Sequence, residues 1–251
     1  MTELPRHQIL DCMINCTDMP QAQRSVHTRL ESGDGGYVCF ANVHTVVTAR
    51  DDMTLRDATN HSFMSMPDGG PLAMLAKRRG IKHIERVSGP DFMWRTLDEQ
   101  RDKRHFFYGS TRPTLDKLES ALQTQFPGLI VAGTLSPPFR ELDADESTAI
   151  HKQIREARPD YIWVGLGAPK QEYWMAENWQ ALQPAILLGV GAAFDFLSGT
   201  KARAPRWMRR LGMEWLFRLL NEPRRLGWRY LSTNTRFLYF LVREAVSGTR
   251  H

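Results

Sequence analysis

An aspartate framed by proline and glycine is the strongest candidate for catalysis. Asp68 stands in Pro67-Asp-Gly-Gly-Pro71, a tight loop before a helix predicted over Leu72–Arg79. An aspartate in such a place is more often a turn residue or a helix N-cap. The alternative is a general base, because the flanking residues fix the backbone and leave space for a ligand hydroxyl. Position alone leaves both interpretations open.

A second candidate segment is Gly165-Leu-Gly-Ala-Pro-Lys-Gln-Glu172, which follows an apolar strand and runs into a helix. Pro169 suits the first helical turn. Gly167, Lys170, Gln171 and Glu172 would then lie near a helix N-terminus, which attracts anions. A capped helix start that binds nothing would have the same pattern.

Two other motifs are discounted. Gly189-Val-Gly-Ala-Ala-Phe194 lacks the last glycine of the dinucleotide fingerprint and the acidic residue about 20 positions later, which disfavours NAD and a dehydrogenase. Asp143-Ala-Asp145 matches the metal-binding pattern of many nucleotide-sugar enzymes, but acidic residues are expected at a helix start. We therefore expect no metal and no cofactor, with arginines meeting any diphosphate.

Strands and helices alternate between about residues 100 and 195, which predicts a parallel α/β sheet with right-handed crossovers. Ligands of such sheets bind beyond the carboxyl ends of the strands. Glycines mark four such places: Gly109-Ser110, Gly133-Thr134, Gly165–Gly167 and Gly189–Gly191. The predicted strands are Gly36–Ala41, Arg104–Tyr108, Leu129–Ala132, Tyr161–Val164 and Ala185–Val190, and the helices between them are Thr111–Gln125, Asp143–Ala157 and Pro169–Leu182.

The first hundred residues are less regular, with a helix predicted over Asn42–Arg56. After residue 200 the pattern is entirely helical, with helices predicted over Trp207–Leu220 and Asn234–Val246 and breaks at Pro205 and Pro223. We predict a catalytic body over residues 1–200, in which 101–200 is the Rossmann-like part, and a helical appendage over 201–251.

The appendage carries the basic character of the chain. Residues 201–251 hold 12 Lys/Arg against three Asp/Glu, a net charge of +9, together with eight of the 25 aromatic residues. Residues 1–200 have a net charge of −4. A basic, aromatic-rich segment favours an anionic partner with an apolar face, such as a membrane surface.

Three cysteines, Cys12, Cys16 and Cys39, give neither a disulfide framework nor zinc-ligand spacing. The N-terminus lacks the pattern of a signal peptide, and no apolar run approaches the roughly 20 residues that span a bilayer. We expect a cytoplasmic protein, peripheral to the inner face of the cell membrane.

Six stretches in this order resemble the WecG/TagA/CpsF family of glycosyltransferases (glycosyltransferase family 26). The resemblance covers roughly residues 35–245. It rests on Ala41–Val43, Pro67–Gly69, Arg86–Asp91, Gly165–Glu172, Gly191–Asp195, and the run from Arg203-Ala-Pro205 through Gly212–Arg218 to Glu222–Arg225.

The resemblance implies an inverting transfer from a UDP-sugar to an undecaprenyl-diphosphate-linked saccharide in surface-polysaccharide synthesis. The sugar would be of N-acetylmannosamine, N-acetylmannosaminuronic acid or glucose type. Asp68 matches the family's catalytic base. The other matching or neighbouring site residues are Asn42, Gly167, Lys170, Gln171, Glu172, Asp195, Arg218, Arg225 and Arg229. The chain departs from the family pattern at Phe40, where some members have Thr, and at Trp228, where an arginine is expected.

The rival function is nucleic-acid binding through the basic segment. Its aromatic residues recur in apolar clusters such as Trp215–Phe217 and Phe237–Val242, which fit lipid or protein contact better than a phosphate-binding stripe. We therefore predict a glycosyltransferase that binds a UDP-sugar, a lipid-linked acceptor and an anionic membrane but no nucleic acid. A homo-oligomer is compatible with the sequence.

Overall fold

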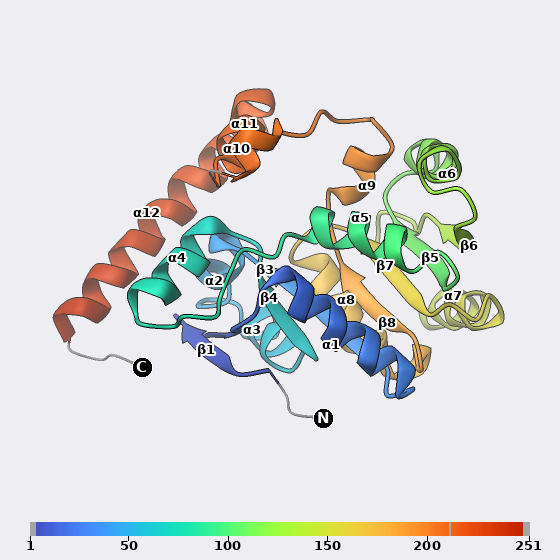
Figure 1. Cartoon of the computed structure of the whole chain (residues 1–251), viewed down its shortest axis with the longest axis horizontal. Coiled ribbons are helices and arrows are strands. Elements are labelled where there is room, and N and C mark those ends of the chain that lie inside the picture. The colour runs from blue at the N-terminus through green and yellow to red at the C-terminus, as the bar shows by residue number, and fades with distance from the viewer. Residues whose placement is uncertain (1–3, 211, 248–251) are drawn as a thin grey trace.

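The computed structural model describes residues 4–210 and 212–247 and confirms a Rossmann-like α/β fold with C-terminal helices. Six parallel strands form one sheet in the order β4-β3-β8-β7-β5-β6 (Figure 1). Their bounds are β3 Gly36–Ala41, β4 Met64–Pro67, β5 Arg104–Gly109, β6 Ile130–Leu135, β7 Tyr161–Gly165 and β8 Ile186–Gly189. An antiparallel hairpin, β1 Arg6–Ile9 and β2 Cys12–Asn15, precedes them.

Helices cover both faces of the sheet because alternate strand residues point to opposite sides. Val38 and Phe40 pack with α1 Met19–Glu31, α5 Gly89–Glu99, α6 Arg112–Gln125 and α9 Ala193–Leu197. Tyr37 and Cys39 face α7 Ala144–Glu156, α8 Lys170–Asn178 and the short 3-10 helix Gln180–Leu182. The sheet is therefore buried on both sides.

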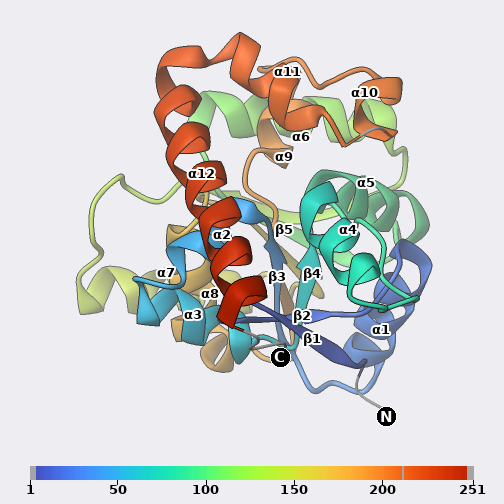
Figure 2. The same ribbon diagram turned by 90° about the vertical axis from the view of Figure 1, so that its left-hand side faces the viewer.

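A third apolar cluster joins the N-terminal hairpin to three short helices and to the C-terminal helix. The short helices are α2 Val43–Thr48, α3 Met53–Asn60 and α4 Gly70–Arg78. Phe237 of α12 Pro223–Ser247 is 6% exposed and belongs to this cluster. Helix α12 runs along α2 at one end of the molecule, while β6 lies at the other end (Figures 1 and 2).

Polar contacts add to the seam between α12 and the body. Arg79 Nη2 lies 2.7 Å from Glu244 Oε2, and Arg236 Nη2 lies 2.6 Å from Asp51 Oδ2. The Arg50 guanidinium stacks over the Phe240 ring at 4.4 Å from its centroid. Helix α12 is therefore docked by side chains from one face along its length.

Several predicted elements differ from those observed. Gly133-Thr134 lies inside β6 and not after it, because the strand runs on to Leu135. The single helix predicted over Asn42–Arg56 is two helices, α2 and α3. The helix predicted over Trp207–Leu220 is also two, α10 Arg206–Arg210 and α11 Glu214–Asn221, separated near Gly212, whose φ is +70°. Pro223 begins α12 and does not only interrupt the chain, since proline suits a first helical turn.

Among the described residues, no helix combines the length and apolar character needed to cross a membrane. Cys12, Cys16 and Cys39 are all free and buried. Burial raises the pKa of each thiol, that of Cys12 to about 12.

Candidate active site

Asp68 lies at the carboxyl end of β4, in the loop that leads into α4. The Asp68 backbone N–H donates to the carbonyl oxygen of Ala41 at 2.8 Å, and the Val87 N–H donates to that of Pro67 at 2.9 Å. The first bond holds the loop against the end of β3, and the second ties it to the segment before α5. The N-cap of α4 is Gly69, not Asp68, and no side chain caps this helix. The interpretation of Asp68 as a helix cap is therefore wrong.

The Asp68 carboxyl group has an unusual electrostatic environment. Burial raises its pKa from 3.8 to about 7. Arg86 and Arg218 oppose this shift, while Glu214 and Asp91 add to it. The carboxylate makes no hydrogen bond or ion pair with any residue in the described part of the chain. A free carboxyl group that titrates near neutral pH is suited to general-base chemistry.

Asn42 caps α2 immediately after β3, beside the Asp68 loop. Its Oδ1 accepts from the Thr45 backbone N–H at 3.2 Å. A Cβ built on Gly69 would lie 3.6 Å from the Asn42 Cβ. The structure thus brings Asn42 close to the loop that carries Asp68.

The segment Gly165–Glu172 divides into an open part and a buried part. Gly167 has a φ of +81° and open space where a side chain would stand, and Lys170 is exposed. Gln171 and Glu172 are 4% and 1% exposed. Gln171 Nε2 donates to the Gly189 carbonyl at 2.8 Å and to Glu172 Oε1 at 2.9 Å.

Gln171 and Glu172 therefore lie beneath the end of β8. Burial raises the pKa of the Glu172 carboxyl to about 7. Gln171 holds the end of β8, while its own Oε1 is buried without a hydrogen-bond partner among the described residues. Glu172, being enclosed, supports Gln171 from inside the protein.

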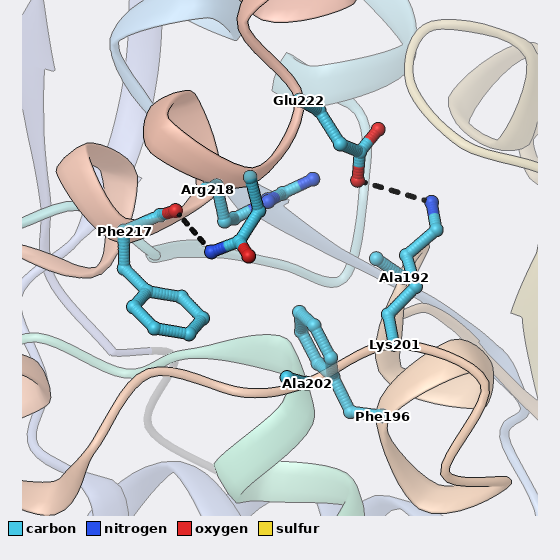
Figure 3. A pocket seen from close by; sticks show the side chains of 8 residues that line it. Ala192, Phe196, Lys201, Ala202, Phe217, Arg218 and Glu222 are labelled. Atoms are coloured by element: carbon cyan, nitrogen blue, oxygen red, sulfur yellow. Dashed lines mark hydrogen bonds and ion pairs between the residues drawn. The ribbon is translucent and has the colours of Figure 1, made fainter.

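A cavity of about 210 Å³ lies between α11 on one side and α9, with the segment that follows it, on the other. Asp195, at the start of α9, forms an ion pair with Lys201 at 3.1 Å. Lys201 also pairs with Glu222 at 3.3 Å (Figure 3). Arg218 also lines the cavity, but it makes no hydrogen bond or ion pair with the described residues. Its guanidinium is therefore available to an anionic ligand. The lining residues are Ala192, Phe196, Lys201, Ala202, Phe217, Arg218, Asn221 and Glu222.

The remaining predicted arginines and the two departures from the family pattern lie in different surroundings. The side chains of Arg225 and Arg229 lie outside the described residues. Trp228 is 78% exposed on the outer face of α12. Phe40 is buried, with its ring edge-on to Phe92 at 5.6 Å between centroids, so it fills the core below the site.

Sequence reasoning missed a charged network that joins the appendage to the body beside Asp68. Arg86 Nη2 donates to Glu214 Oε2 at 2.6 Å. Asp91 Oδ1 lies 2.8 Å from Arg203 Nη2 and 2.9 Å from Arg209 Nη1. Arg86, Asp91 and Arg203 fall in the motifs quoted above, but nothing in their spacing indicates that they meet.

The acidic pair Asp143 and Asp145 marks the start of α7. Asp143 is the N-cap, and its Oδ1 accepts from the Glu146 backbone N–H at 2.8 Å in a capping box. Within residues 4–210 and 212–247, no group of three or more His, Cys, Asp or Glu side chains could hold a metal ion.

Comparison with known proteins assigns the chain to a family. The model of the glycosyl transferase WecG/TagA/CpsF family matches residues 7–251. An N-acetylglucosaminyldiphosphoundecaprenol N-acetyl-β-D-mannosaminyltransferase of Bacillus subtilis (strain 168) is 29% identical over 213 residues, 84% of this chain and 80% of that protein. Proteins of the same name from Bacillus spizizenii and Staphylococcus aureus (strain MW2) are 27% and 26% identical, covering 89% and 87% of this chain and 86% of each relative. The chain therefore belongs to the WecG/TagA/CpsF family of glycosyltransferases.

Proposed function

We propose that this protein transfers a sugar from a UDP-sugar to a saccharide linked to undecaprenyl diphosphate, in the assembly of a bacterial surface polysaccharide. The names of the relatives favour N-acetylmannosamine as the sugar and N-acetylglucosamine as the acceptor residue. N-acetylmannosaminuronic acid and glucose are the alternative donor sugars. The observation that supports this proposal most directly is Asp68, whose carboxyl group has a pKa of about 7 and makes no hydrogen bond or ion pair with the described residues, beside Arg218, which is also unpaired among them.

The proposed reaction is a single displacement. Asp68 takes the proton of an acceptor hydroxyl as that oxygen bonds to the anomeric carbon of the donor. The bond from this carbon to the UDP oxygen breaks, and UDP leaves with the electron pair. Attack from the face opposite the leaving group inverts the anomeric configuration.

Charge on the departing UDP needs positive partners, for which we propose arginines and no divalent metal. Arg218 lines the cavity and is unpaired within the described residues. A guanidinium can bind two phosphate oxygens in one plane. Arg225 and Arg229 remain proposed contacts, as do Asn42, Gly167, Lys170 and Gln171. No cofactor is needed for this displacement.

Residues 201–251 are proposed to hold the catalytic body against an anionic membrane. The outer face of α12 is apolar, and its large side chains are 59–83% exposed: Trp228, Leu231, Leu238, Tyr239, Val242 and Val246. The opposite face, with Leu226 and Phe237, is buried against the body. An apolar stripe along a helix that carries several arginines fits the headgroup region of a bilayer better than nucleic acid. The protein would then work at the cytoplasmic face of the membrane.

The proposed reaction is tested by UDP release. The protein is mixed with each candidate UDP-sugar and with a polyprenyl-diphosphate-linked N-acetylglucosamine, in buffer with EDTA. We expect UDP release that needs both substrates, is fastest with UDP-N-acetylmannosamine, and is lost in Asp68→Asn. UDP release that does not depend on the lipid acceptor, or activity only with a sugar donor of another nucleotide, would contradict the proposal.

The membrane contact is tested separately with anionic liposomes. Leu231→Glu and Val242→Glu place a charge on the outer face of α12 and should weaken liposome binding without lowering thermal stability. Gln123→Glu adds the same charge at an exposed polar position of α6, away from α12, and controls for net charge alone. Equal binding by all three variants and the unaltered protein would show that this face does not meet the membrane.

A further inference from the structure

Arg86 lies near Asp68, the proposed catalytic base, but does not pair with it. Arg86 lies in the body, before α5, and its positive charge acts on the Asp68 carboxyl group. Yet no ion pair joins the two, since no nitrogen of Arg86 comes within 4.0 Å of an Asp68 carboxylate oxygen among the described contacts. The guanidinium is instead committed elsewhere.

Two groups of the appendage hold Arg86. Its Nη2 donates to Glu214 Oε2 at 2.6 Å, and its Nη1 donates to the Arg209 carbonyl oxygen at 3.1 Å. Glu214 is 12% exposed and Arg86 21%, so this pair is largely shielded from water and from salt. Arg203 Nε lies 3.5 Å from the other oxygen of Glu214, which fixes the carboxylate from a second side.

A carboxylate paired with a guanidinium is a poor base, because the pair stabilises the ionised form and lowers its pKa by about 1–3 units. Among the described residues, the charges that act on Asp68 are those of Arg86 and Asp91 from the body and of Glu214 and Arg218 from α11. Of these, Glu214 both repels negative charge on Asp68 and binds Arg86, the cation with the largest effect on the Asp68 carboxyl group.

We propose that Glu214 is a positioning residue, which holds Arg86 away from Asp68 and so keeps the Asp68 carboxylate free to accept a proton. This inference rests on the proposed function, in which Asp68 is the base. Because Glu214 belongs to the appendage, the base is freed only when α11 is docked beside it. An undocked appendage leaves Arg86 to pair with Asp68, which lowers the basicity of the site.

The test compares kcat against pH for full-length variants in UDP release with the lipid-linked acceptor. In Glu214→Gln, we expect the acid limb to move to lower pH by about one unit or more, and the plateau to fall by about tenfold or more, as Arg86 pairs with Asp68. Glu244→Gln is the matched control: it breaks another Arg–Glu pair between the appendage and the body, formed by α12 with Arg79 at the end of α4. Its pH profile should match that of the unaltered protein.

The double variant Arg86→Gln/Glu214→Gln separates positioning from simple stability. With no guanidinium left to pair with Asp68, the acid limb should return to or above its original pH and the plateau should recover. If Glu214→Gln keeps the original acid limb, or if the double variant is no better than the single one, the inference is wrong. If Asp68→Asn is as active as the unaltered protein, it is the proposed base that fails.

Discussion

The titration of Asp68 gives the sharpest prediction. With a pKa of about 7, the carboxyl group is ionised in roughly one molecule in ten at pH 6 and nine in ten at pH 8. If Asp68 is the base, kcat should therefore rise about tenfold between these pH values and level off above. Asp68→Asn keeps the shape but removes the basicity, so it should lower kcat by about 10²–10⁴-fold at pH 8.

The same shift predicts a stability difference that does not depend on activity. The unfolded chain ionises this carboxyl near pH 4, whereas the folded protein resists ionisation until about pH 7. A raised carboxyl pKa thus means that stability is lost as the pH rises through this window. Asp68→Asn should be more stable than the unaltered protein at pH 8, and the difference should shrink steadily towards pH 4.

Two measurements check this reasoning: steady-state UDP release from pH 5 to 9, and urea unfolding of both proteins at pH 4, 6 and 8. Glu119→Gln, a carboxylate to amide change on α6 far along the sheet, is a control for the chemistry of the substitution. A kcat that is flat from pH 5 to 9, together with equal stability of Asp68→Asn and the unaltered protein at every pH, would refute both the raised pKa and the role of Asp68.

Three further predictions follow from other parts of the molecule. Activity should survive excess EDTA; loss that Mg²⁺ or Mn²⁺ restores would return Asp143 and Asp145 to consideration as ligands. Burial lowers the pKa of His105 to about 4, so urea unfolding should show stability falling as the pH drops from 6.5 towards 4, and His105→Gln should flatten this part of the profile. A Cβ on Gly109, whose φ is +119°, would lie 2.7 Å from the Gly165 carbonyl carbon, so Gly109→Ala should cost about 2–3 kcal/mol in urea unfolding; a cost below about 0.5 kcal/mol would contradict the crowding.

The parallel sheet was predictable where its strands are apolar runs. Gly36–Ala41 and Tyr161–Gly165 are almost wholly buried, because helices cover both faces, and such strands leave a continuous apolar signal. The strand that precedes Asp68 was missed for a physical reason. Met64–Pro67 has four residues, no β-branched side chain and a terminal proline, and it is held by long-range bonds such as Ser65 N–H to Asn15 Oδ1 at 2.7 Å.

The site was predictable only where one short segment carries its own signal. The loop of Asp68, with its proline and glycines, is such a segment. The start of α7 was also predictable, because Asp143 is a typical helix N-cap. The pairing of Arg86 with Glu214 joins residues 128 positions apart, and no local pattern encodes it. The sequence pattern also does not predict the burial of Glu172, because this burial depends on β8 passing above α8.

The three buried cysteines have a practical consequence for following the appendage. A thiol reacts with alkylating labels as the thiolate, and burial holds all three in the protonated form out of contact with reagent. A cysteine introduced at an exposed position of α12, such as Thr235, would therefore be the fast-reacting thiol of the folded protein. A single fluorophore or spin label placed there would report the movement of this helix without removal of any native cysteine.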